Sequence, residues 1–325
     1  MGKNFADELI SQIREKKSII CIGLDPRLPD DKETYYIPQF LVNEFNDNSK
    51  VIFEFNKRLI DATVEFTPIY KPNIAFYEKY EALTGLKKTI KYIQNKNALV
   101  ILDAKRGDIG TTCQVYASNL FEGYNADSIT LNSYFGSDGV EPFISYKEKG
   151  FFTQVKNSNK SSVEFQDLFS IHLENIPIKQ VSIKIDKIKG DQTILERNFI
   201  HMARLVKEWG KELIGINGYS SFGAVVGATF PEQMISIRKI LDNCFLLIPG
   251  YGTQGATGED VVHGVNDDGL GAIINSSRSI DFAYQKLNYS NKFSPENFDK
   301  AASEAALKMR EDINRKLKQN NKNII

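Results

Sequence analysis

Residues 98–108 read ALVILDAKRGD, in which a short apolar run ends abruptly in a cluster of alternating charges. A run of about five apolar residues rich in β-branched side chains is typical of a strand buried on both faces. Runs of this kind recur along the chain, and most are followed by a stretch with helical periodicity. Together with Ala98–Leu102 they are Ile19–Leu24, Pro68–Lys71, Ser128–Asn132, Phe151–Val155, Phe222–Val226, Cys244–Ile248 and Ala272–Asn275.

Eight buried strands that alternate with helices predict a parallel sheet covered by helices, and eight is the number that closes a (β/α)₈ barrel. A doubly wound open sheet produces a similar rhythm, so the pattern alone leaves both α/β architectures open. The 325 residues suffice for one such barrel, which needs about 250, and we expect a single domain over residues 1–325. The clearest helical segments are Val51–Thr63, Gly85–Asn95, Phe199–Trp209 and Pro231–Leu241.

Three regions depart from this rhythm. Residues 26–49 are polar and rich in Asp, Asn and Pro, which predicts a loop excursion. Residues 165–192 form an expected insertion after the fifth strand, and the alternation in Val181–Asp186 favours a strand or hairpin there. Residues 295–325 are expected to carry a C-terminal helix, because apolar positions recur at helical spacing from Phe298 to Ile313.

The composition excludes several classes of function. Lys+Arg and Asp+Glu balance at 41 each, so we expect no nucleic-acid partner. The three cysteines lie far apart and the three histidines are scattered, which argues against a disulfide framework and a metal site. No apolar run approaches the roughly 18 residues of a membrane span, and the amphipathic N-terminus lacks the core of a signal peptide. We therefore expect a cytoplasmic protein with no membrane partner.

The charges that follow the third strand are the strongest chemical signal. Barrel enzymes carry their reactive groups at the carboxyl ends of the strands, and period-two alternation would place Asp103 and Lys105 on one face. A carboxylate beside an ammonium keeps it protonated, so such a lysine can stabilise a carbanion and then protonate it. A surface ion pair on a loop is the alternative. Lys71 at the end of the neighbouring strand favours a preorganised network instead.

A phosphate site is indicated at the ends of the last two strands. The glycine-rich segment Gly250–Gly255 follows the seventh run, and Ser277-Arg278 follows the eighth. Loops after strands seven and eight commonly bind phosphate in this architecture, through backbone N–H groups and an arginine fork. A tight turn beside a solvated arginine is the alternative.

The element Asp103-x-Lys105-x-x-Asp108-Ile109, with Lys71 upstream, resembles the catalytic signature of the orotidine 5′-phosphate decarboxylase family. The resemblance extends from Gly23 to Arg278, and the segments LDAKRGDIGTT, YKPNIAFYE, VVGAT and INSSRS are most similar to the longer, type 2 branch. It implies a barrel that converts orotidine 5′-phosphate to uridine 5′-phosphate and CO₂ with neither cofactor nor metal.

The resemblance also implies a role for each matched residue. Lys71, Asp103, Lys105 and Asp108 would form the catalytic array, in which Lys105 protonates C6 and Asp103 lies near the substrate carboxylate. Asp108, with Ile109 and Thr112, would reach across a homodimer interface into the partner's site. The remaining substrate contacts would be Asp25 and Asn73 to the ribose, Ser158 and Pro249 to the pyrimidine, and Gln254, Ser277 and Arg278 to the phosphate.

Some positions depart from the family pattern. Lys160 stands where proline is expected, Ser277 stands where many relatives have glycine, and the insertion at 165–192 is long. Two other functions compete. One is an Mg²⁺-dependent sugar-phosphate decarboxylase or synthase on a related barrel, whose members lack a lysine where Lys71 stands. The other is a non-catalytic nucleotide-binding barrel, which would be expected to have lost one of the four charged residues.

Overall fold

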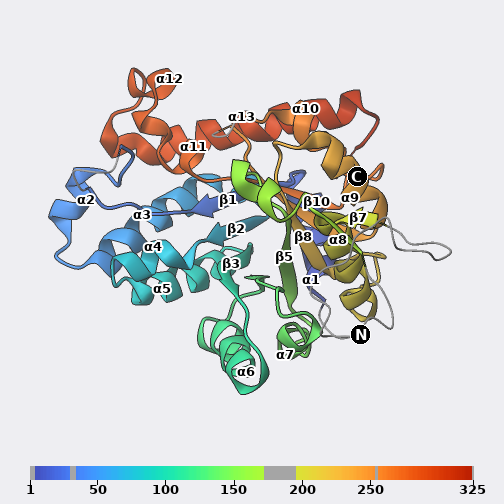
Figure 1. The fold of residues 1–325 in the computed structure, drawn as a ribbon. Coiled ribbons are helices and arrows are strands. Elements are labelled where there is room, and N and C mark those ends of the chain that lie inside the picture. Colours follow the sequence, from blue (N-terminus) through green and yellow to red (C-terminus); the bar gives the residue numbers. More distant parts are fainter. Residues whose placement is uncertain (1–3, 30–33, 172–194, 253–254, 324–325) are drawn as a thin grey trace, which may run out of the picture.

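The computed structural model describes residues 4–29, 34–171, 195–252 and 255–323. Its centre is a closed barrel of parallel strands in the order β1-β10-β9-β8-β5-β4-β3-β2, surrounded by helices (Figure 1). The eight barrel strands are β1 Ile20–Leu24, β2 Ile69–Pro72, β3 Leu99–Arg106, β4 Ser128–Leu131, β5 Gly150–Lys156, β8 Ser220–Val226, β9 Cys244–Pro249 and β10 Ala272–Ser276.

The closure of the sheet confirms the barrel and rules out the doubly wound alternative. Ile22 of β1 is paired with Tyr70 of β2 on one side and with Ser276 of β10 on the other, so the barrel has no free edge. All eight strands coincide with the apolar runs of the sequence, because a strand covered on both faces needs apolar side chains at nearly every position.

The helices lie between and outside the strands. The four segments predicted to be helical are confirmed as α3, α5, α8 and α9, with ends shifted by a few residues. The helices are α1 Phe5–Lys16, α2 Gln39–Glu44, α3 Asn48–Thr63, α4 Ile74–Lys79, α5 Leu83–Asn95, α6 Gly110–Ser118, α7 Glu141–Ile144, α8 Asn198–Trp209, α9 Pro231–Ile240, α10 Gly258–Val261, α11 Arg278–Asp281, α12 Leu287–Ser290 and α13 Phe298–Gln319.

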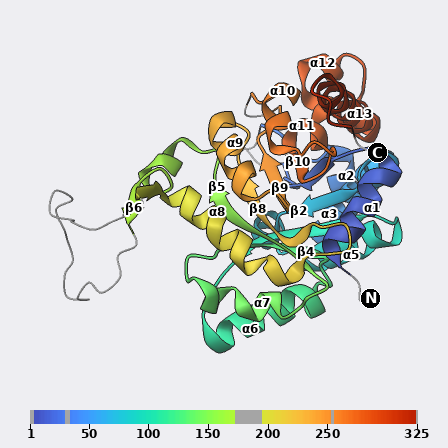
Figure 2. The ribbon, with the colours of Figure 1, turned by 90° about the vertical axis from the view of Figure 1, so that its right-hand side faces the viewer.

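Two of the irregular regions differ in detail from the prediction. Residues 26–49 are not only a loop: they contain α2 and the start of α3, where the Asp47 side chain accepts the Lys50 N–H at 2.8 Å as an N-cap. The insertion after β5 includes an antiparallel pair, β6 Phe169–Ile171 and β7 Leu195–Arg197, and Figure 2 shows β6 standing out from the barrel. The strand predicted at Val181–Asp186 lies outside the described residues.

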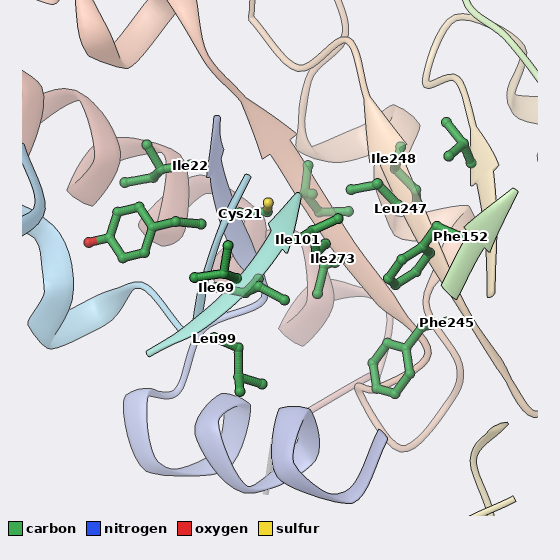
Figure 3. Close-up of a cluster of buried hydrophobic side chains, with 14 of the residues drawn as sticks. Cys21, Ile22, Ile69, Leu99, Ile101, Phe152, Phe245, Leu247, Ile248 and Ile273 are labelled. Atoms are coloured by element: carbon green, nitrogen blue, oxygen red, sulfur yellow. The ribbon is translucent and has the colours of Figure 1, made fainter. Parts of the chain in front are cut away.

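Apolar side chains fill the barrel beneath its carboxyl end. Figure 3 shows Ile69, Ile101, Phe152 and Ile273 gathered from four different strands, and all four are fully or almost fully buried. Because strand side chains alternate, Lys71 and Asp103 lie two residues beyond Ile69 and Ile101 on the same interior face. The charged pair therefore lies directly above an apolar plug, at the end of the barrel where the strands terminate, which we call the mouth.

The amino-terminal helix α1 closes the opposite end of the barrel. Phe5 meets Phe152 edge to face, with ring centroids 6.3 Å apart, and its ring fills the space that a Cβ on Gly150 would need. The Lys16 ammonium at the other end of α1 donates to the carbonyls of Thr67 and Asn97, just before β2 and β3. No helix in the described residues is long and apolar enough to cross a membrane.

We expect Phe5→Ala to lower the free energy of unfolding by about 3–5 kcal/mol, because it removes a buried ring and leaves a cavity under β5. Leu287→Ala is the matched control: this side chain is 79% exposed, and its loss should change the unfolding free energy by less than about 0.5 kcal/mol. Urea denaturation measures both variants. Equal losses of unfolding free energy in the two variants would show that the buried Phe5 ring does not stabilise the amino end of the barrel.

Candidate active site

Three of the four predicted catalytic residues meet at the mouth of the barrel. Lys71 Nζ donates to Asp103 Oδ2 at 2.8 Å, and Lys105 Nζ donates to the other oxygen, Oδ1, at 2.6 Å. Thr130 Oγ1 also donates to Oδ1, at 2.8 Å. The Asp103 carboxylate thus accepts three hydrogen bonds, two of them from ammonium groups, and it is fixed in one orientation.

Charge outweighs burial in this cluster. Burial would raise the pKa of Asp103, but the charges and hydrogen bonds of Lys71 and Lys105 together hold that pKa well below its usual range. Burial would likewise lower the pKa of Lys71, and the carboxylates of Asp103 and Asp25 raise it above its ordinary value instead. Asp103 is therefore ionised and Lys71 is a cation at neutral pH.

The two lysines differ in their access to the mouth. The side chain of Lys71 is only 8% exposed, and its ammonium is paired with Asp103. That of Lys105 is 50% exposed and lines a cavity of about 290 Å³ at the mouth. Lys105 is therefore the ammonium that a bound molecule would meet.

The backbone at Lys105 departs from regular strand geometry, so strand alternation alone does not explain its contact with Asp103. Its backbone has a φ of 46°, and the pairing of β3 with β4 shifts register between Leu102 and Arg106. Non-glycine residues avoid this left-handed region, and holding one there costs about 1 kcal/mol or more. The Lys105 N–H donates to Thr130 Oγ1 at 3.0 Å, so the same hydroxyl that orients Asp103 also holds the strained residue.

The fourth predicted catalytic residue, Asp108, lies apart from the other three. Within the described part of this chain, its carboxylate accepts the N–H of Ile109 at 2.8 Å and is paired with neither lysine. Ile109 is 54% exposed, and Thr112 is exposed on the first turns of α6. The loop that carries Asp108, Ile109 and Thr112 thus faces outward.

The predicted ribose-binding residues flank Lys71. Asp25 follows β1, and Asn73 follows β2, where its Oδ1 accepts the Ala75 N–H and caps α4. Burial raises the pKa of Asp25, and the nearby charge of Asp103 adds to the rise, against the opposing effects of Lys71 and a hydrogen bond with Ser277. A parallel β-bridge joins the backbone of Asn73 to that of Asp103, so the pairing of the β2 and β3 segments continues up to this side of the mouth.

A second buried carboxyl, Asp281, was missed by the sequence analysis. It is fully buried on α11, and its Oδ2 accepts the Asp25 N–H at 3.2 Å. Burial, with the neighbouring Asp25, raises the pKa of Asp281 well above its ordinary value. No local motif marks this residue, because only the closure of β1 against β10 brings it beside Asp25.

The predicted phosphate-binding residues Ser277 and Arg278 lie at the mouth where β10 meets β1. Ser277 and Arg278 follow β10, and the Arg278 guanidinium lies 5.8 Å from the centre of the Tyr35 ring. A Cβ on Gly23 would lie 1.9 Å from Ser277 Oγ, so a glycine is needed where β1 passes this serine. Pro249 ends β9, and Gln254 lies outside the described residues.

The loop after β5 is held by a buried lysine that the sequence analysis did not single out. Lys156 is fully buried, and its Nζ donates to Asp167 Oδ1 at 2.8 Å and to Ser162 Oγ at 3.0 Å. Ser158 lies at the start of this loop, where its carbonyl accepts Thr229 Oγ1. Lys160, which replaces an expected proline, begins a 3₁₀ turn that ends at Glu164.

The described residues contain no cluster of three or more His, Cys, Asp or Glu side chains arranged to hold a metal ion. The mouth instead offers an ammonium beside a carboxylate, flanked by polar groups from β1, β2, β5 and β10. Such an arrangement can stabilise a developing negative charge and supply a proton.

Removing the Asp103 carboxylate should destabilise the protein in a pH-dependent manner. With Asp103→Asn, Lys71 becomes a buried charge that has lost its hydrogen-bonded carboxylate, which should cost about 3–5 kcal/mol of unfolding free energy at pH 7. Burial would then lower the Lys71 pKa below its ordinary 10.5, so the folded state would bind fewer protons than the unfolded state. The stability of the variant should therefore rise with pH between neutrality and 10.5.

Asp61→Asn is the control for this experiment, since Asp61 pairs with Lys57 and Lys96 on the surface and should contribute no more than about 1 kcal/mol. Denaturant titrations at several pH values measure both variants. A loss for Asp103→Asn as small as that for Asp61→Asn would show that Lys71 does not depend on this carboxylate.

Comparison with known proteins agrees with this geometry. Residues 18–290 match the sequence model of the Orotidine 5′-phosphate decarboxylase / HUMPS family. An orotidine 5′-phosphate decarboxylase of Petrotoga mobilis is 41% identical over 316 residues, covering 94% of this chain and 97% of the relative. That of Clostridium acetobutylicum is 37% identical, covering 96% of this chain and 99% of the relative.

A solved structure shows the same fold. The OMP decarboxylase of Leishmania donovani superimposes with a TM-score of 0.69 at 28% sequence identity, covering 96% of this chain and 98% of the other. The agreement therefore extends over nearly the whole chain in both sequence and structure. With the match of residues 18–290, it shows that this chain belongs to the Orotidine 5′-phosphate decarboxylase / HUMPS family.

Proposed function

We propose that this protein converts orotidine 5′-phosphate to uridine 5′-phosphate and CO₂, the last step of UMP synthesis, without a cofactor. One observation carries the proposal: the half-exposed ammonium of Lys105 is held 2.6 Å from a buried carboxylate at the mouth of the barrel. The full-length similarity to orotidine 5′-phosphate decarboxylases supports the same substrate.

The reaction needs a charged group at C6 of the pyrimidine. When the bond between C6 and the carboxylate carbon breaks, its electron pair stays in an in-plane orbital that the ring π-system cannot delocalise. The Lys105 ammonium would stabilise that pair and donate one proton to C6, and water would then reprotonate the amine. Fixed charges are a strong source of such stabilisation, and enzymes supply about 8–23 kcal/mol in all.

Asp103 and Lys71 would prepare Lys105 for this role. The Asp103 carboxylate positions the Lys105 ammonium through their hydrogen bond, and Lys71 helps to keep Asp103 ionised in spite of its burial. Asp103 would also lie near the substrate carboxylate, where the repulsion between like charges is relieved as CO₂ departs.

The rest of the nucleotide would be bound around the mouth. Asp25 and Asn73 would contact the ribose hydroxyls, and Ser158 and Pro249 would contact the pyrimidine. Gln254, the backbone of Ser277 and the Arg278 guanidinium would bind the phosphate. Phosphate contacts far from C6 can still accelerate the chemistry, because their binding energy can close the site.

We further propose that the active form is a homodimer with shared sites. In one chain the outward-facing Asp108 loop leaves the cluster with three of its four charges, and exposed Ile109 and Val115 give α6 and the loop before it an apolar surface. Asp108, Ile109 and Thr112 of one chain would complete the site of the other. We also assign the chain to the type 2 branch and to the cytoplasm, where its unpaired cysteines would stay reduced.

The function is tested by the loss of absorbance of orotidine 5′-phosphate in the presence of EDTA. We expect turnover by the natural protein, whereas Lys105→Ala should lose at least about 10³-fold in kcat because it removes the proton donor. Uridine 5′-phosphate should still bind the variant. Strict dependence on Mg²⁺ would favour the sugar-phosphate alternative, and the absence of turnover would favour a non-catalytic barrel.

The shared site is tested by mixing two inactive variants. Chains with Asp108→Asn and chains with Lys105→Ala should each be inactive as homodimers, yet a mixed dimer contains one site with both natural residues. At random exchange, about a quarter of all sites would be intact, so activity should recover toward that fraction. Mixing that restores no activity, although mass spectrometry detects mixed dimers, would contradict the shared site.

A further inference from the structure

The side chain of Gln154 is a polar group at the mouth for which the reaction outlined above has no use. Phe152 of β5 belongs to the apolar plug (Figure 3), and Gln154 lies two residues beyond it on the same strand. The alternation of strand side chains therefore directs Gln154 into the barrel above the plug. It is at the same level as Lys71 and Asp103, which lie two residues beyond Ile69 and Ile101.

Gln154 and Lys105 line the same cavity, whose volume is about 290 Å³. Apolar side chains, among them Val155, Phe199 and Met202, form much of the remaining wall. A small group attached to C6 and lying against the Lys105 ammonium would therefore enter a cavity that Gln154 also faces.

The carboxamide of Gln154 has unused hydrogen-bonding capacity. Its Nε2 is buried and donates to no acceptor among the described residues. Three other amides of the cavity wall hold loop backbone instead: Asn132 accepts from Tyr134 N–H, Gln166 accepts from Asn157 N–H, and Asn198 donates to the Phe165 carbonyl. A buried donor without a partner is costly, and such groups are often completed by a ligand.

We propose that Gln154 binds the carboxylate of the substrate through its Nε2, an inference that rests on the proposed decarboxylation. The carboxylate is attached to C6, and C6 must lie against Lys105 to receive its proton, so the carboxylate lies within the cavity that both residues line. The amide can turn about its terminal torsion, which has broad minima, to direct N–H at an oxygen. Gln154 thereby selects for substrates with a carboxylate at this position.

This contact has a distinctive kinetic consequence. A hydrogen bond to a full negative charge is strong, whereas the departing CO₂ is neutral and accepts only weakly. The contact therefore stabilises the ground state more than the transition state. Its removal should weaken substrate binding without lowering kcat.

The test compares Gln154→Met with the natural protein, because methionine has a similar length and no donor. We expect the KM for orotidine 5′-phosphate to rise about tenfold with kcat unchanged or higher. Uridine 5′-phosphate lacks the carboxylate, so its inhibition constant should change less than about twofold. Gln154→Glu keeps the shape of the side chain and adds a negative charge, so it should raise the ratio of KM to that inhibition constant further than Gln154→Met does.

Three results would overturn the proposal. An equal loss of affinity for both nucleotides would place Gln154 against the pyrimidine edge that they share. A fall in kcat at constant KM would show that Gln154 makes its contact in the transition state. Unchanged kinetic constants in both variants would show that Gln154 contacts neither the bound substrate nor the transition state. Failure of the natural protein to decarboxylate orotidine 5′-phosphate would instead refute the proposed function. Thermal melting of both variants confirms that they are folded.

Discussion

The site depends on one carboxylate that is kept ionised where water is scarce. Asp103 can be both buried and ionised because two ammonium groups and a threonine hydroxyl donate hydrogen bonds to its two oxygens. Those partners come from β2, β3 and β4, so the charge balance exists only when the three strands are in register. The parallel barrel therefore acts as the frame for a charge cluster that no isolated segment of the chain could hold.

The apolar plug and the charge cluster constrain each other. Ile69 and Ile101 exclude water from below, which strengthens the attraction between Lys71 and Asp103 directly above them. Exclusion of water also makes a buried polar group without a partner costly. The mouth nevertheless contains a strained lysine and a glutamine Nε2 that has no hydrogen-bond partner among the described residues. Such departures from the most stable arrangement are typical of sites shaped for a ligand.

The fold was predictable because each barrel strand carries a continuous apolar run, and the ends of those runs indicated Lys71, Asp103 and Lys105 as neighbours. Contacts set by closure were not predictable: Asp281 meets Asp25 only when β10 returns to β1. The left-handed turn at Lys105 was also missed, since strand alternation assumes regular backbone. The short helix α2 was taken for loop, because only Leu41 among its residues is buried and its apolar pattern is therefore weak.

The two lysines have different tasks, and their exposure explains why both are needed. Lys71 is enclosed, and because the carboxylates of Asp103 and Asp25 keep it charged it can in turn keep Asp103 ionised. Lys105 is half exposed, so in the proposed reaction its ammonium would have room to follow the reacting carbon while Asp103 still holds it. A single lysine could not both neutralise Asp103 and meet a substrate. An enclosed lysine would be out of reach of the substrate, and an exposed one would leave the buried Asp103 with too little positive charge beside it. In the proposed mechanism, the division of one charge cluster into a fixed cation and an accessible one thus follows from placing proton transfer at the boundary between the water-free barrel interior and its open mouth.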